Sequence, residues 1–247
     1  MLARTNTVAF HGVDVLPIDV QAQVANGLPA FALVGLPDKA VAESRQRVRA
    51  ALNALGLALP ARRITVNLAP ADVAKEGSHF DLPIAMALLV AMGILPADAV
   101  AEFTALGELG LDGGLAPVAG VLAAAIAASS QGRGLICPAS QGGEAAWSGG
   151  EVLAAPSLLA LINHFRGSQV LARPTPELAD EVAGCLDLKD IKGQETAKRA
   201  LEVAAAGGHN LLMMCRVYLG GLSGRPFWVD PCSRGGPTMA FMARAMA

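Results

Sequence analysis

Apolar residues recur at two different spacings along the first two-thirds of the chain. Every second residue from Ile18 to Val24 is apolar, which is the pattern of a strand with one buried face. Between Pro37 and Gly56 the apolar residues instead fall on one helical stripe, so this segment is predicted to be an amphipathic helix. The residues of that stripe are Val41, Val48, Leu52 and Leu55.

Strand and helix patterns continue to alternate up to residue 166, which predicts an α/β fold. The expected strands are 7–10, 13–24, 31–34, 64–68, 103–106, 109–111, 135–137 and 152–154. Further helices are expected over 84–92, 118–129 and 158–165.

The pattern changes after residue 166. Residues 167–186 contain Pro174 and Pro176 and are interpreted as a linker. Residues 187–214 predict a helix over 194–206 and a strand over 210–214, which is expected to lack sheet partners. The tail, 215–247, holds no lysine or glutamate and keeps no regular period, so it is expected to be frameshifted or disordered.

Composition narrows the class of protein. Hydrophobic residues make up 53% of the chain and charged residues 16%, so it can build a sizeable core. The net charge of −2 excludes a globally basic nucleic-acid binder but leaves room for local basic patches. The apolar stretches are too short, or too interrupted by proline and glycine, to span a membrane.

Metal and disulfide chemistry are not indicated. The four cysteines show no C-x-x-C spacing, and no histidine lies near enough in the sequence to suggest a zinc site, which favours free thiols in a reducing compartment. The four histidines are scattered over different predicted elements, so no metal site is expected. The N-terminus has no apolar segment of a signal peptide, and a cytoplasmic location is expected.

Three runs carry a resemblance to a known family. They are ALVGLPDKAVAESRQRVRAA over 32–51, ITVNLAPADVAKEGSHFDLPIA over 64–85, and DLKDIKGQETAKRALEVAAAGGHNLLMM over 187–214. Residues 1–214 resemble the YifB/ComM family of magnesium chelatase-like AAA+ ATPases. The resemblance implies a Lon protease-like domain over 1–166, with the mixed sheet and flanking helices of the ribosomal protein S5 domain 2-like fold. It also implies the incomplete start of an AAA+ module over 187–214.

The family's P-loop does not follow at the expected place. A G-x-x-x-x-G-K-[ST] loop uses backbone N–H groups, a lysine and a hydroxyl to hold phosphates and Mg²⁺. Met214 is followed instead by CRVYLGGLSGRP, and no lysine occurs after Lys198. The tail is interpreted as out-of-frame translation or a truncation scar of a longer ATPase. No cofactor is expected for this chain, although the family implies ATP and Mg²⁺ and would place Ile191 and Gly193 near the adenine.

The protease resemblance points to two positions at which a Ser–Lys dyad would lie. Alignment with the Lon motifs puts Asp81 in the place of the nucleophile and Leu122 in the place of the lysine. Neither side chain can perform that chemistry. Ser78 and Lys75 lie nearby in one loop, but the sequence does not predict active proteolysis.

Basic residues gather at two places before the linker. Arg45, Arg47 and Arg49 occur in one predicted helix, where Arg45 and Arg49 share a face, and Arg62 and Arg63 precede a predicted strand. Arg45, Arg49, Arg62 and Arg63 are candidate contacts to a nucleic-acid backbone. The other interpretation is an ordinary solvated helix face balanced by Glu43, and the sequence alone favours it.

Three functions remain open. The family resemblance implies a DNA-processing motor that acts on single-stranded or branched DNA in natural transformation and recombination, assembled as a hexamer. A magnesium-chelatase-type ATPase subunit is the second possibility. The third is a non-catalytic interaction or oligomerisation domain derived from a protease fold.

Overall fold

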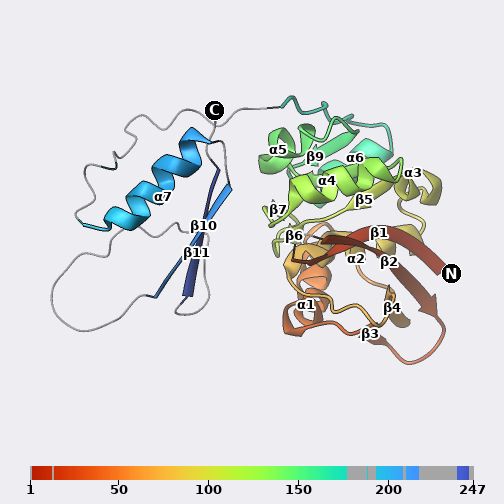
Figure 1. The fold of residues 1–247 in the computed structure, drawn as a ribbon. Coiled ribbons are helices and arrows are strands. Elements are labelled where there is room, and N and C mark those ends of the chain that lie inside the picture. The colour runs from red at the N-terminus through yellow and green to blue at the C-terminus, as the bar shows by residue number, and fades with distance from the viewer. Residues whose placement is uncertain are drawn as a thin grey trace. The chain divides into compact units, whose positions relative to one another are not determined.

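The computed structural model describes residues 2–12, 14–176, 188, 193–207, 210–216 and 238–244, the last two segments by their backbone (Figure 1). The chain divides into two compact units, residues 1–179 and 180–247. The boundary falls within the segment that composition marks as a linker. Among the described residues, no helix combines the length and the apolar character needed to cross a bilayer.

A seven-stranded sheet forms the centre of the first unit, in the order β3-β4-β2-β1-β5-β8-β9. The β1–β2 and β2–β4 pairs are antiparallel, whereas the other four pairs are parallel, so the sheet is mixed as expected. Its strands are β1 (Leu2–His11), β2 (Asp14–Ala25), β3 (Ala30–Val34), β4 (Arg63–Ala69), β5 (Phe103–Ala105), β8 (Gly134–Pro138) and β9 (Val152–Ala155). A separate short pair consists of β6 (Glu108–Leu109) and β7 (Leu115–Ala116).

Six α-helices accompany the sheet, and the α/β fold class is confirmed. They are α1 (Lys39–Ala54), α2 (Asp81–Ala91), α3 (Ala97–Ala101), α4 (Val121–Ser130), α5 (Gly142–Ala146) and α6 (Leu158–Phe165), with single 3₁₀ turns at Ser78–Phe80 and Ala139–Gln141. The sequence pattern predicted α1, α2, α4 and α6 but missed the two five-residue helices. A helix of that length is too short to show a period.

The core consists of two clusters of buried side chains, one on each face of the sheet. Successive β1 residues separate them, because Ala9 belongs to the first cluster and Val8 to the second. The first cluster takes in α1, α2 and α6, and the second takes in α4 and α5. Ile18, Val20 and Ala22 are buried in the first cluster, which confirms the alternation predicted for β2.

The start of α1 is fixed by a side-chain cap. Oδ1 of Asp38 accepts a hydrogen bond from the backbone N of Val41 at 2.7 Å. The start of α4 lies at Val121, three residues after the predicted position. The preceding Gly120 has a φ of +83°, and a Cβ there would lie 2.6 Å from the Phe10 ring. A residue with a left-handed backbone cannot belong to a right-handed helix, which accounts for the later start.

The second unit contains α7 (Glu195–Ala206) and an antiparallel pair, β10 (Asn210–Arg216) and β11 (Thr238–Arg244). The expectation that the strand over 210–214 lacks a sheet partner was wrong. Thr238–Arg244 contains no proline or glycine and is mostly apolar, so it is suited to a strand ladder. Residues 217–237 and 245–247 of the tail lie outside the described residues, and its frameshift or disorder stays a prediction.

Candidate nucleic-acid interface

A hollow lies between α1 and β3, the strand at one edge of the sheet. It has a volume of about 540 Å³. Its lining residues are Pro29, Ala30, Phe31, Arg45, Gln46, Arg49, Ala50 and Asn53. The arginines, Gln46 and Asn53 come from α1, whereas Phe31 belongs to β3. Only polar and basic side chains of the helix therefore reach the hollow, apart from Ala50.

A second hollow of about 380 Å³ adjoins the first and shares four of its lining residues, including Arg49 and Asn53. Arg62, the residue directly before β4, lines this second hollow. The parallel pairing of β3 with β4 brings Arg62 here, since the backbone N of Ala30 donates to the carbonyl O of Arg62 at 3.4 Å. We call the two hollows with Arg45, Arg49 and Arg62 the arginine groove.

The arginine groove carries positive charge without neutralising acids. No carboxylate lines either hollow, and no ion pair among the described residues involves its three arginines. One guanidinium N–H of Arg45 donates to the carbonyl O of Phe31 at 3.3 Å, which directs the side chain along the edge of β3. Arg63 does not line the hollows, although it directly follows Arg62. The structure thus brings three of the four candidate arginines together.

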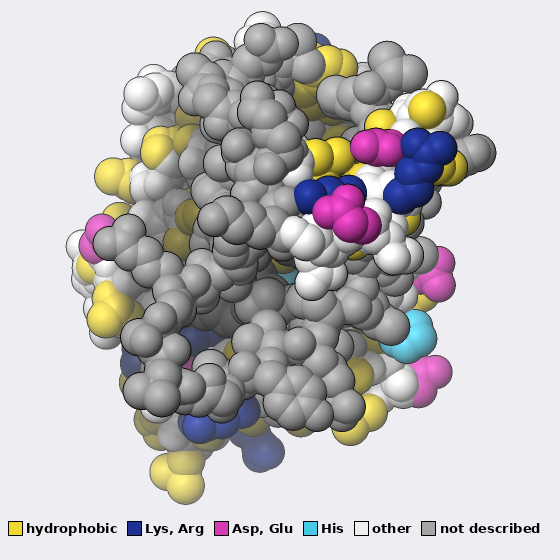
Figure 2. Space-filling model, turned by 60° about the vertical axis from the view of Figure 1, so that its left-hand side comes forward, with side chains coloured by type: hydrophobic (Ala, Val, Ile, Leu, Met, Phe, Trp, Pro, Cys, Tyr) yellow, Lys and Arg dark blue, Asp and Glu magenta, His cyan; other side chains and the backbone are white. Residues whose placement is uncertain are grey.

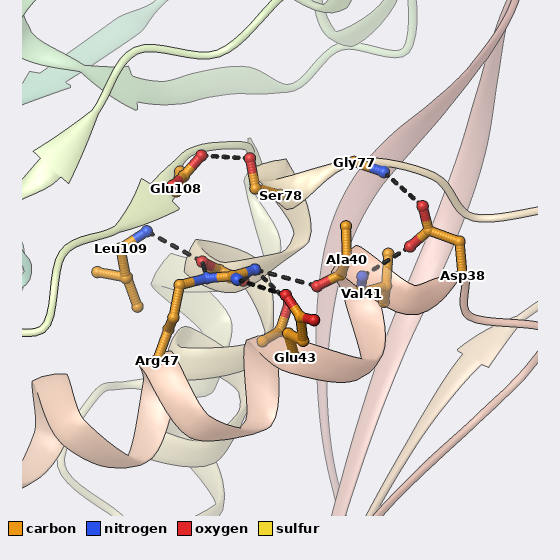
Figure 3. A network of polar contacts seen from close by, with 11 residues as sticks. Asp38, Ala40, Val41, Glu43, Arg47, Gly77, Ser78, Glu108 and Leu109 are labelled. Carbon is orange, nitrogen blue, oxygen red and sulfur yellow. Dashed lines mark hydrogen bonds and ion pairs between the residues drawn. The ribbon is translucent and has the colours of Figure 1, made fainter.

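Glu43 does not balance this charge. Its carboxylate lies 4.0 Å from Nη1 of Arg47, one turn along α1, and its side chain is largely exposed (Figure 3). On the face of the molecule that Figure 2 shows, the basic side chains at the upper right are mixed with acidic ones, whereas those at the lower left lie mostly apart from acidic side chains.

Arg47 belongs to a different site from its two neighbours. Its Nε and Nη2 donate to Oδ2 and Oδ1 of Asp81 at 2.6 and 3.0 Å, a two-pronged ion pair. Nη2 also donates to the carbonyl O of Ala40 at 3.1 Å (Figure 3). The hydrogen bond to Asp81 raises the pKa of Arg47 above its ordinary value, against the opposing effect of burial.

Asp81 is fully buried at the first turn of α2, and both of its carboxylate oxygens accept hydrogen bonds, so neither is available as a nucleophile. In addition to Arg47, it accepts a hydrogen bond from the backbone N of Leu109 at 3.2 Å. A carboxylate at this end of a helix is also favoured by the helix dipole. Asp81 therefore joins α1, α2 and β6 and is a structural residue. Leu122 lies half-buried on α4 with no group that could exchange a proton.

The nearby Ser78 and Lys75 do not form a substitute dyad. Ser78 Oγ donates to the carboxylate of Glu108, and Lys75 Nζ donates to the carbonyl O of Pro70. Burial lowers the pKa of Lys75, with Asp72 acting in the opposite direction. A Ser–Lys catalytic pair needs the amine to take the hydroxyl proton. The hydrogen bonds described here direct the two groups to different partners.

The remaining sequence-predicted positions add no second site. His79 is buried and hydrogen-bonded to the carbonyl O of Val8 at 2.9 Å, and its burial lowers its pKa. No group of three metal-ligating side chains occurs among the described residues. Gly193 lies two residues before α7, whereas Ile191, the other candidate adenine contact, lies outside the described residues.

Sequence reasoning missed the ion pair of Arg47 and the lining residues of the groove that are not arginines. A signal existed for the first: Arg47 is two positions from Arg45 and Arg49, so it must point to another side of the helix. Its acceptor Asp81 is 34 residues away, and no local spacing identifies it. Gln46 and Asn53 carried no signal, because polar residues are usual on an exposed helix face.

Comparison with known proteins gives the family. Residues 20–141 match the family "Subunit ChlI of Mg-chelatase", and residues 187–220 match "Magnesium chelatase, subunit ChlI". The chain is 44% identical over 214 residues to "Uncharacterized protein YifB" of Escherichia coli and 43% identical over 220 residues to "Competence protein ComM" of Haemophilus influenzae. It belongs to the YifB/ComM family of magnesium chelatase-like proteins.

A third relative is an uncharacterized protein of Mycobacterium tuberculosis, which is 40% identical to the chain over 214 residues. Each of these alignments covers 86% of the chain but only 42–43% of the relative. The chain thus spans less than half the length of the YifB/ComM relatives it matches. The second family match runs to residue 220, six residues past Met214, the last residue of the family resemblance in the sequence.

Proposed function

We propose that this YifB/ComM protein serves in DNA processing and that its first unit holds a nucleic-acid backbone in the arginine groove. The observation that carries the proposal is the convergence of Arg45, Arg49 and Arg62 on two adjoining hollows that no carboxylate lines. The name of the Haemophilus relative, a competence protein, supports a role that involves DNA. Single-stranded or branched DNA is the proposed partner.

The chemistry of the groove suits phosphates better than base edges. Guanidinium groups bind phosphate oxygens through paired N–H donors, and such contacts give affinity without reading the sequence. Arg45 and Arg49 are one helical turn apart, so their side chains can reach successive groups along an extended strand. Three phosphate contacts on a single strand predict a slope of about −2 for the logarithm of affinity against the logarithm of salt concentration.

Replacing Arg49 is expected to weaken DNA binding most, because this residue lines both hollows. We expect Arg49→Gln to lower the affinity for a fluorescent single strand by about tenfold at low salt. The same change should reduce the salt slope by about 0.7. Anisotropy titrations over a salt series, with single-stranded and forked oligonucleotides, measure both quantities.

Arg173→Gln is the matched control for this titration. Arg173 is highly exposed and pairs with Glu151 at 2.9 Å, outside the groove. Its loss should leave affinity and slope unchanged. Equal effects of Arg49→Gln and Arg173→Gln, or no binding by the unaltered protein at low salt, would refute the proposed DNA contact.

A non-catalytic interaction domain is the second candidate, and the occupied Asp81 favours it over a protease. In this case the first unit assembles rings or binds protein partners. Self-association without DNA binding, measured by light scattering, is the outcome that supports it. A magnesium-chelatase-type ATPase subunit is the third, and it rests on the descriptions of the matching families.

We also propose that the chain binds ATP weakly or not at all and does not hydrolyse it. The printed sequence holds no G-x-x-x-x-G-K-[ST] run, so the backbone cradle and lysine that grip phosphates are missing. Isothermal titration with ATP and Mg²⁺ is expected to show no saturable heat at micromolar concentrations. Saturable binding of ATP at micromolar concentrations would contradict this expectation and support an ATPase role for the chain itself.

A further inference from the structure

The loop over residues 26–29 crosses the start of β4, next to the arginine groove. The strand order β3-β4-β2 places β4 between the two strands that the loop connects. Ala25 at the end of β2 and Ala30 at the start of β3 both pair with Arg63. The loop must therefore pass over the end of β4 at which Arg62 and Arg63 lie.

Leu28 lies in this loop and is 88% exposed, more than any other large hydrophobic residue among those described. The next residue, Pro29, lines both hollows of the arginine groove. On the other side, a Cβ on Gly27 would lie 3.7 Å from Cβ of Arg63. An apolar side chain thus lies in solvent at the rim of the groove, in a loop that passes next to two arginines.

The loop is anchored at its C-terminal end. The backbone N of Ala30 bonds to the carbonyl O of Arg62, and the fixed φ of Pro29 restricts the chain just before it. An anchored loop holds Leu28 at one place relative to the arginines. One nucleic-acid strand can then contact the arginines through its phosphates and Leu28 through its bases at the same time.

The positive charge of the arginine groove indicates which class of partner would contact the exposed Leu28. A purely apolar partner would leave Arg62 and the other groove arginines without counter-charges, whereas a nucleic acid offers phosphates and apolar base faces together. Proteins that bend or open DNA use leucine among their apolar wedges between bases. The one aromatic ring that lines the hollows, Phe31, is only 7% exposed, which leaves Leu28 as the apolar group next to the groove.

We propose that Leu28 contacts the bases of a nucleic-acid strand whose phosphates lie in the arginine groove, and that this contact unstacks neighbouring bases. The inference rests on the proposed function, because it requires the arginine groove to hold DNA. Unpaired or branched DNA offers separable bases at lower cost than a duplex. Leu28 therefore favours such DNA over a perfect duplex.

The test uses a DNA fork that carries 2-aminopurine, a base whose fluorescence rises on unstacking, at successive positions in its single-stranded arm. With the unaltered chain, fluorescence should rise at one or two positions. Leu28→Ala should abolish this rise and reduce the preference for fork over duplex by about fivefold. The salt slope should stay as in the unaltered chain, because no phosphate contact is lost.

Two control variants separate this inference from the proposed function. Ile126→Ala removes another exposed aliphatic side chain, 56% exposed on α4, and should change nothing. Arg49→Gln should lower affinity at every position without moving the site of unstacking. An unchanged fluorescence rise in Leu28→Ala overturns the role of Leu28 while DNA binding stands. If the unaltered chain binds no DNA, or if Arg49→Gln binds as tightly as the unaltered chain, the proposed function itself is overturned.

Discussion

Asp81→Ala is expected to lower the free energy of unfolding of the first unit by about 3–5 kcal/mol. The change leaves the Arg47 guanidinium, whose side chain is only 20% exposed, without its carboxylate partner. It also removes the acceptor of the Leu109 backbone N–H. The part-buried charge then keeps only the exposed carboxylate of Glu43, 4.0 Å away, and the Leu109 N–H loses its acceptor. Urea denaturation followed by circular dichroism measures the loss.

A second pair of variants identifies the cause. Replacing both partners, with Arg47→Met and Asp81→Leu, should recover much of the lost free energy, because no charge is left unpaired. Glu43→Gln should cost less than about 0.5 kcal/mol, since Glu43 is exposed and lies 4.0 Å from Arg47. If Asp81→Ala costs no more than Glu43→Gln, the ion pair contributes little and our account of Asp81 is wrong.

Local patterns predicted much of the fold because apolar residues recur at strand or helix spacing in the buried elements. The alternation of Ile18, Val20 and Ala22 and the apolar stripe of α1 both point to the first core cluster. The interior helix α2 also matched, although all its residues are buried and it has no polar face. The strand order, which sets β3 at the edge and β4 inside it, depends on long-range pairing and could not be read from spacing.

The candidate site could be predicted only in part, for the same reason. Helical spacing placed Arg45 and Arg49 on one face, and the structure has both lining one hollow. Arg62 joins them only because β3 runs parallel to β4. Arg47, though part of the same basic run, contacts the buried Asp81 instead. Grouping charges by sequence position therefore mixes a groove residue with a core residue, and only the fold separates them.

Gly35→Ala is expected to destabilise the first unit by about 3 kcal/mol or more. Gly35 has a φ of +105°, and a Cβ on it would lie 2.2 Å from the carbonyl O of Leu68 in β4. The left-handed backbone costs about 1–2 kcal/mol for alanine, and the clash with a rigid strand adds a cost of similar size. Because Gly35 connects β3 to α1, which both line the arginine groove, its displacement should also disturb the groove and weaken the proposed DNA binding.

Gly132→Ala separates the two contributions. Gly132 has a similar left-handed conformation, with a φ of +70°, but no atom lies within 4 Å of the position of its Cβ. Its replacement should therefore cost only the free energy of the left-handed backbone, about 1–2 kcal/mol, and leave the proposed DNA binding unchanged. Parallel urea titrations of the two variants measure the difference. Equal losses would mean that the contact with Leu68 relaxes freely, and that the β3–α1 connection does not hold the groove in place.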